Sequence, residues 1–138
     1  MHVHYHDWMG ELFLANGVTT VKDLGNDIVW ISDVSAAVEQ GKINGPRIFY
    51  VGDGVDTPPP ARETHVVVEN VAQAKRVVDI QHSKGATAVK VREKMTPELI
   101  KAIVEEAHKY GMQVSGHLRS VDAREAADAG IDGLEHAS

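Results

Sequence analysis

"TPELIKAIVEEAHKYGMQVSGH", residues 96–117, contains a helix, a glycine and a strand in the order that decides the fold. Thr96 is a candidate N-cap, and Pro97 suits the first helical position, where its missing N–H costs nothing. Apolar side chains then recur at helical spacing and predict a single buried face, made of Leu99, Ile100, Ile103, Val104 and Ala107. Gly111 ends the helix, and the strand "MQVSGH" that follows it ends on His117.

The same unit of helix, glycine, strand and polar residue occurs four times. A single example could be only a solvated strand end, but the repetition favours a shared structural role. In a parallel barrel all strands run in one direction, so polar groups at their ends converge on one rim, where such barrels carry their chemistry. The glycines and the polar residues that follow them are Gly17 with Lys22 and Asp23, Gly85 with Lys90, Gly111 with His117, and Gly130 with His136.

The alternation of β-branched and helical segments predicts an α/β fold, namely a parallel (β/α) TIM-type barrel that is incomplete, with about six of eight strands. One domain, 1–138, would hold them. A doubly wound open sheet is the alternative, but no glycine-rich phosphate loop supports it. The expected strands are 2–4, 18–23, 47–52, 87–92, 112–117 and 131–136, and the expected helices are 7–16, 32–40, 69–84, 96–111 and 120–129.

Composition excludes several classes of function. The net charge of -6, from 14 basic and 20 acidic residues, argues against binding to a nucleic acid backbone. No apolar run approaches the roughly 20 residues that span a bilayer, so we expect no membrane role and take the cytoplasm as the default compartment. Because the sequence has no cysteine, a metal site would need histidine or carboxylate ligands.

Histidines are concentrated in the first eight residues, "MHVHYHDW". On a strand, residues two apart point to the same side, so His2 and His4 can direct both imidazoles at one point on the rim. His117 and His136 would add two more ligands for a shared metal ion. Each could instead be a satisfied core histidine. The other histidines, His6, His82 and His108, are read as surface residues.

Lys90 is the cationic member of this set. Near divalent cations its neutral amine is favoured, and a neutral amine can capture carbon dioxide to give a carbamate that bridges two metal ions as a carboxylate does. The alternative is a lysine whose stem packs while its ammonium group reaches water.

Six stretches together resemble signatures of the amidohydrolase superfamily, in particular its imidazolonepropionase-like and prolidase-like branch. They are "MHVHYHDW", "ANGVTTVKDLG", "GPRIFYVGDGVD", "AVKVRE", "TPELIKAIVEEAHKYGMQVSGH" and "AGIDGLEHAS". The resemblance implies that the family's first metal motif matches His2 and His4. It also implies that a carboxylated lysine ending strand four matches Lys90, and that histidines ending strands five and six match His117 and His136.

Two family features have no counterpart between Met1 and Ser138. The motif's aspartate would fall one position before Met1, and the aspartate that ends strand eight would fall after Ser138, together with strands seven and eight and the flanking β domain. The resemblance therefore implies a fragment. We expect metal binding with weak or absent turnover, and a homo-oligomer in which a neighbour covers the unpaired strand edges.

The resemblance implies hydrolysis of amide or peptide-like C–N bonds by a metal-activated hydroxide, with one or two divalent ions, zinc first among them, and carbon dioxide for the lysine. The substrate would be a small or peptide-like molecule. In the long segment 52–70 and beyond it, Arg62, His65 and Arg119 are candidate contacts for a substrate carboxylate, although solvated charges are the alternative. A phosphoester or lactone hydrolase and a non-catalytic partial barrel remain open.

Overall fold

Within residues 1–136 the strands pair only in parallel, as the repeated unit predicts. A computed structural model describes residues 1–136, so the last two residues of the expected domain lie outside the described part. One sheet has the order β1-β2-β3, and the other has the order β5-β4-β6-β7-β8. The strands are β1 His2–Val3, β2 Thr20–Asp23, β3 Arg47–Tyr50, β4 Val55–Asp56, β5 Val66–Val67, β6 Ala88–Val91, β7 Gln113–Gly116 and β8 Gly133–Leu134.

Side-chain caps set where most of the helices begin. Asp27, Asn70, Thr96 and Asp122 each accept a hydrogen bond from a backbone N–H in the first turn of the helix that follows. The second helix begins four residues before the expected position, because Asp27 caps it there. None of the helices within residues 1–136 has the length and hydropathy of a membrane span. The helices are α1 Met9–Ala15, α2 Ile28–Glu39, α3 Val71–Ser83, α4 Pro97–Lys109 and α5 Ala123–Asp128.

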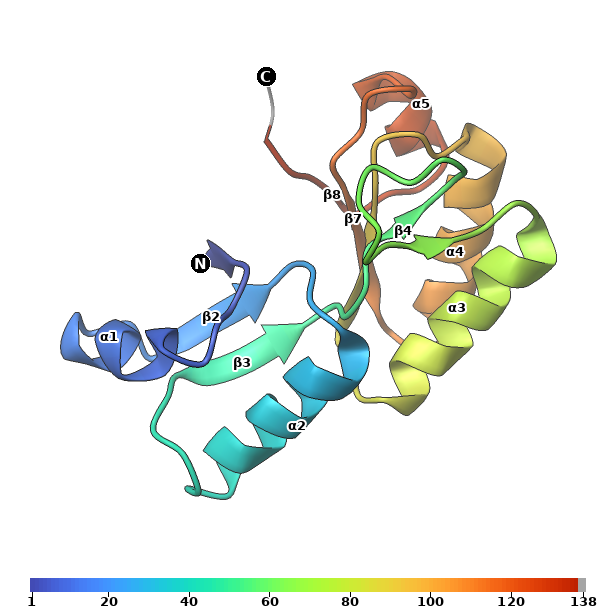
Figure 1. Cartoon of the computed structure of the whole chain (residues 1–138). Coiled ribbons are helices and arrows are strands. Elements are labelled where there is room, and N and C mark those ends of the chain that lie inside the picture. Colours follow the sequence, from blue (N-terminus) through green and yellow to red (C-terminus); the bar gives the residue numbers. More distant parts are fainter. Residues whose placement is uncertain (137–138) are drawn as a thin grey trace.

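The two sheets join into one arc (Figure 1). The Thr87 N–H donates to the Tyr50 carbonyl at 2.9 Å, and the Arg92 N–H donates to the Val55 carbonyl at 2.9 Å, so β3 and β4 lie one after the other along the edge of β6. Helix α2 packs against β3, and α4 packs against β6 and β7. This arrangement is the expected incomplete (β/α) barrel.

The strand count differs from the expectation. Six strands lie at the expected positions, but segment 52–70, expected to be irregular, also contains β4 and β5. The two are paired by hydrogen bonds from the Val66 N–H to the Gly54 carbonyl and from the Val68 N–H to the Asp56 carbonyl, both 2.9 Å. Two residues are too few to show the alternation that marks a strand in a sequence, so the pattern could not reveal them.

The core lies between the arc and its helices. Each of the four β6 residues is buried, as expected for a central parallel strand covered on both faces. The predicted buried face of α4 is confirmed, since all five of its apolar residues are buried. Burial of each of its Leu, Ile and Val side chains stabilises the fold by up to about 1.5–3 kcal/mol. The helix-ending glycines are also confirmed: Gly17, Gly85, Gly111 and Gly130 all have positive φ, between 69° and 88°.

Candidate functional site

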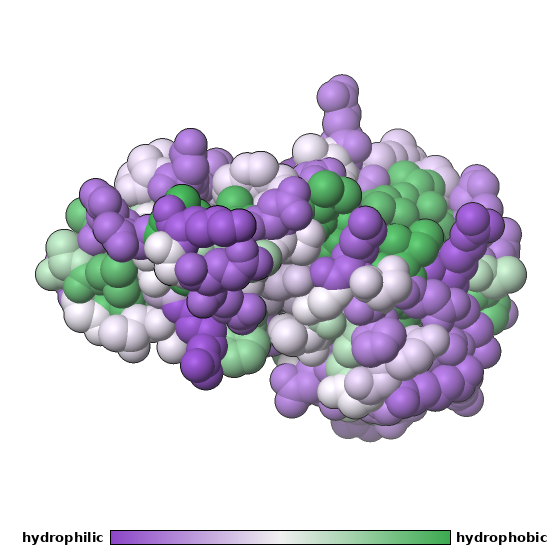
Figure 2. Space-filling view, turned by 90° about the horizontal axis from the view of Figure 1, so that it is seen from below, coloured by the Kyte–Doolittle hydropathy of each residue, from purple (hydrophilic) through white to green (hydrophobic). Residues whose placement is uncertain are grey.

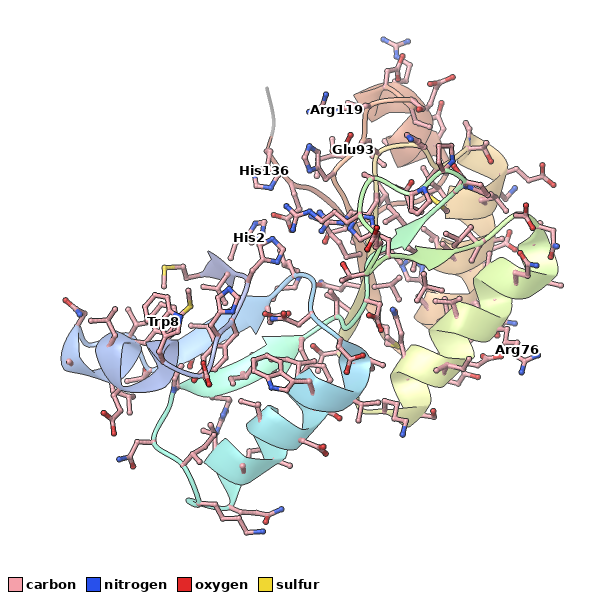
Figure 3. All side chains as sticks on the ribbon, viewed as in Figure 1. His2, Trp8, Arg76, Glu93, Arg119 and His136 are labelled. Atoms are coloured by element: carbon pink, nitrogen blue, oxygen red, sulfur yellow. The ribbon has the colours of Figure 1, made fainter. Side chains whose placement is uncertain are left out.

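The carboxyl ends of the parallel strands bring the predicted site residues together. His2 and Lys90 lie within β1 and β6, while His4, His117 and His136 follow β1, β7 and β8. Figure 3 shows His2 and His136 close to each other, between the two halves of the arc. Residues from opposite ends of the chain therefore meet at one rim, as the repeated unit predicts.

The four imidazoles form a continuous row. The ring centroids of His4 and His2 are 5.5 Å apart, those of His2 and His136 are 5.0 Å apart, and those of His136 and His117 are 5.0 Å apart. We call these four residues the histidine row. Within the described residues, no three His, Asp or Glu side chains are placed as they would be around a metal ion. The histidine row is thus a set of neighbouring donors whose role in metal binding stays a prediction.

Hydrogen bonds determine which nitrogen is available in two of these rings. His4 Nδ1 lies 3.1 Å from the Gly25 carbonyl oxygen, and His2 Nδ1 lies 3.1 Å from Glu135 Oε2. Because a carbonyl and a carboxylate only accept hydrogen bonds, Nδ1 carries the proton in both rings when they are neutral. The Nε2 lone pair of each ring is therefore free, as in metal-binding histidines whose other nitrogen is held by an acceptor.

The surroundings of His2 and His117 favour the neutral form of these two rings. Burial lowers the pKa of His2, and the nearby Lys90 and His4 lower it further, while Glu135 opposes them. Burial likewise lowers the pKa of His117, with His136 adding to the effect. A neutral imidazole at pH 7 has the lone pair that a metal ion requires.

A buried carboxylate positions the loop that carries His4. Asp23 is 0% exposed, and its Oδ2 accepts hydrogen bonds from the Tyr5 N–H at 2.7 Å and from Asn26 Nδ2 at 2.6 Å. Its Oδ1 accepts from the Gly25 N–H at 3.1 Å. Asp23 therefore ties the chain after β1 to the chain after β2, and so holds the Gly25 carbonyl that orients His4.

Lys90 lies beneath the histidine row and is 0% exposed. Its Nζ is 3.8 Å from Glu135 Oε1 and has no hydrogen-bond partner within residues 1–136. Burial lowers the pKa of Lys90 to about 8, with Glu135 opposing the shift and Arg92 adding to it. Burial raises the pKa of Glu135, but Lys90 and His2 outweigh that effect and keep it below the usual value. The amine is therefore easily deprotonated and lacks the contacts that would normally satisfy it.

The rim beyond His117 carries an ion pair. Glu93 Oε2 lies 3.1 Å from Arg119 Nε, and Glu93 Oε1 lies 3.9 Å from His117 Nε2. Both Glu93 and Arg119 are labelled in Figure 3, above His136. Because Arg119 already has a carboxylate partner, its expected contact with a substrate stays a prediction without support from this geometry.

Three site residues were missed by sequence reasoning. Asp23 was noted only as a strand end, and neither Glu135 nor Arg92 was singled out. Alternation could have found Arg92, because residues two apart on a strand share a side and Arg92 follows Lys90 by two. Glu135 directly precedes His136, and only the folded chain shows that it reaches His2.

The remaining histidines differ in their surroundings. His6, His82 and His108 are exposed, as expected. His82 stacks on Tyr110, with centroids 4.1 Å apart, and His108 Nε2 lies 3.0 Å from Asp132 Oδ2. By contrast, His65 is only 8% exposed, so it is more buried than its position in the long segment 52–70 suggests.

Comparisons with known proteins agree with this architecture. Residues 9–138 match the sequence profile described as the amidohydrolase family. No curated protein matches the chain. Among solved structures, a candidate prolidase from Bifidobacterium longum is 26% identical, with a TM-score of 0.85, over 98% of this chain and 38% of its own.

Two further structures resemble the fold. A Xaa-Pro dipeptidase is 23% identical, with a TM-score of 0.78 over 94% of this chain and 39% of its own, and an ochratoxinase from A. niger is 24% identical, with a TM-score of 0.79 over 94% and 38%. The chain spans about two-fifths of the length of these structures. With the profile matched over nearly all of its residues, this chain belongs to the amidohydrolase family.

Proposed function

We propose that this chain forms part of the catalytic centre of a metal-dependent hydrolase that cleaves amide or peptide-like C–N bonds in small substrates. The observation that carries this proposal is the histidine row above buried Lys90, at the carboxyl ends of parallel strands. Membership of the amidohydrolase family supports the reaction class.

The residues present fit a divalent ion in the chemistry of their donors. His2 and His4 have free Nε2 lone pairs, because acceptors hold their Nδ1–H groups. His117 and His136 add two imidazoles from neighbouring strands, and such nitrogen ligands suit zinc. When bound, a divalent ion lowers the pKa of a water molecule and polarises a carbonyl oxygen. In this proposal His2 and His4 would hold one ion, and His117 and His136 another.

Lys90 would join the two ions as a carbamate. The ammonium group first loses a proton; the neutral amine then attacks carbon dioxide, a C–N bond forms as one C=O π bond opens, and a second proton is released to solvent. The cation would so become an anion with two oxygen donors. Burial and the unpartnered Nζ support this reaction, because the pKa of about 8 gives Lys90 a far larger share of neutral amine at neutral pH than an ordinary lysine has. The two cations would in turn stabilise the carbamate.

The other residues would keep the site in its working form. Asp23 holds the Gly25 carbonyl, and that carbonyl holds the Nδ1 proton of His4. Glu135 holds the Nδ1 proton of His2. Each contact orients an imidazole and raises the basicity of its free nitrogen.

Metal content tests the proposal. The chain is purified without chelator, zinc, manganese and iron are counted per chain by elemental analysis, and the count is repeated for His117→Ala. His82→Ala is the matched control, because His82 is an exposed histidine on α3. We expect metal in the parent and in the control, and less in His117→Ala. A parent without metal, or an unchanged count in His117→Ala, would favour a non-catalytic partial barrel.

Association of copies of this chain is a second part of the proposal. Within residues 1–136, β1 and β8 each have a strand partner on one side only. Figure 2 shows hydrophobic patches between hydrophilic regions on the face it displays. Unpaired edges and exposed apolar side chains favour association. Light scattering should therefore give a mass above that of one chain, and a uniform monomer would contradict this part. The exposed apolar residues include Trp8, Leu12, Val29, Ile43, Phe49 and Leu134.

A further inference from the structure

A second group of polar residues surrounds a small cavity next to His4. The cavity measures about 20 Å³, and its volume suits one or two water molecules or a single carboxylate group, not a whole substrate. Gly25, whose carbonyl orients His4, lines it. The cavity therefore borders the residue that orients His4, at one end of the histidine row. The other lining residues are Asn26, Asp53, Gly54, Arg62, Thr64, His65 and Arg92.

Arg92 is the central residue of this group. It is 7% exposed, and its Nε has no hydrogen-bond partner within residues 1–136. The side chain lies over two glycines, since a Cβ on Gly54 would be 2.7 Å from Arg92 Nε and a Cβ on Gly25 would be 3.2 Å from Arg92 Nη2. The Cβ added to Gly25 would also lie 3.3 Å from His4 Cε1. The guanidinium and the His4 ring therefore meet over one glycine.

His65 and Arg62 add to the positive and donor character of the cavity. Both ring nitrogens of buried His65 lack hydrogen-bond partners within the described part of the chain. Arg62 lines the same cavity from the exposed side. A buried guanidinium nitrogen and two buried ring nitrogens without partners are costly unless a ligand or water satisfies them.

The nearby carboxylates are already engaged. Asp56 is fully buried and accepts hydrogen bonds from the backbone N–H groups of Thr57, Ala61 and Lys94, while its Oδ2 lies 3.6 Å from His65 Nδ1. Asp53, which also lines the cavity, accepts a hydrogen bond from the Ile28 N–H at 3.3 Å. Neither carboxylate forms a hydrogen bond with Arg92, so the N–H groups of the Arg92 guanidinium remain available for an anion.

We propose that Arg92, with Arg62 and His65, binds a carboxylate of the substrate. An arginine fork pairs with a planar carboxylate through two parallel hydrogen bonds, and the cavity has room for that group alone. The substrate class is an amide with a free carboxylate near the scissile bond, such as an N-acyl amino acid or a dipeptide. The position of the scissile bond rests on the proposed function, whereas binding of the carboxylate does not require a metal.

Binding without metal tests this inference separately. The chelator-treated chain is titrated with N-acetylglycine, with its neutral amide N-acetylglycinamide and with methyl phosphate, and binding is followed by NMR of the ¹⁵N-labelled protein. The variants are Arg92→Met and Arg62→Met, and Arg76→Met is the matched control. Arg76 is exposed on α3 and points away from the site (Figure 3). Gly54→Ala keeps every charge but pushes its new methyl group against Arg92 Nε.

We expect the parent and Arg76→Met to bind the acid about tenfold or more tightly than the amide, as loss of a charge-assisted pair predicts. Arg92→Met and Gly54→Ala should lose this preference, and Arg62→Met should reduce it. Equal binding of acid and amide by the parent, or full preference in a folded Arg92→Met, would overturn the inference, as would tighter binding of methyl phosphate. If Arg92→Met does not fold, an unchanged preference for the acid over the amide in both Gly54→Ala and Arg62→Met would overturn the inference.

The two proposals can fail independently. A chain that prefers N-acetylglycine through Arg92 but binds no metal refutes the proposed function and leaves the carboxylate site standing. A chain that binds metal but does not distinguish the acid from the amide refutes only the carboxylate site.

Discussion

Replacing Asp23 by asparagine tests how the loop that carries His4 is held. The carboxylate accepts three hydrogen bonds, two at Oδ2 from Tyr5 and Asn26 and one at Oδ1 from Gly25. Asparagine has the same shape, so it creates no cavity. Its best orientation leaves the carbonyl oxygen at Oδ2 and turns the NH₂ group toward the Gly25 N–H.

The magnitude follows from these contacts. The part-buried Gly25 N–H then faces another donor, and an unsatisfied donor costs up to about 1–3 kcal/mol when it is shielded from water. The two remaining hydrogen bonds change from charge-assisted to neutral, which roughly halves their strength. We expect Asp23→Asn to lower the free energy of unfolding by about 3 kcal/mol, a large part of the about 5–15 kcal/mol typical of a domain.

Urea unfolding followed by circular dichroism measures this change. Asp33→Asn on α2 is the matched control, because Asp33 is exposed, and we expect it to lie within about 0.5 kcal/mol of the parent. Asp23→Asn should also weaken metal binding, since the Gly25 carbonyl that orients His4 moves. A loss below about 1 kcal/mol in Asp23→Asn, at an unchanged denaturant slope, would refute the assigned role of Asp23.

Two further predictions concern ionisable groups. Burial raises the pKa of Asp132, but hydrogen bonds from His108 and from the Val114 N–H outweigh it and leave the pKa below its usual value of 3.8. This stabilisation is present above about pH 4 and is lost as the pH falls through the folded-state pKa. Asp132→Asn should therefore be less stable than the parent at pH 7, and the difference should shrink in urea titrations at lower pH; a constant difference would contradict this. In ¹³C-bicarbonate, a carbamate NMR signal should appear in the parent and in the control Lys101→Met, but not in Lys90→Met. A carbamate signal that persists in Lys90→Met would show that Lys90 is not the residue that reacts with carbon dioxide.

The parts of the fold that repeat could be predicted from the sequence. Each of Gly17, Gly85, Gly111 and Gly130 needs a positive φ at the end of a helix, and that requirement is local, so the sequence shows it directly. Polar residues at strand ends are also local signals. The gathering of Lys90 and the histidine row then follows from the direction of parallel strands.

Other features depend on contacts that no local pattern encodes. β4 and β5 are two residues long, and they exist because Val55 and Val66 find partners across the fold. The role of Asp23 depends on Tyr5, which precedes it by 18 residues, and that of Glu135 depends on His2, which is 133 residues away. Such contacts become visible only when the arc is assembled.

The contact between His2 and Glu135 links the site to the order in which the chain folds. It closes nearly the entire chain into a loop, and contacts of such long separation form after local helices and neighbouring strands. β1 and β8, the strands that supply it, are two residues each and lie at the ends of their sheets, so we expect them to fray readily. We therefore expect the histidine row to assemble late and to come apart early, while the buried strand β6 and helix α4 stay folded.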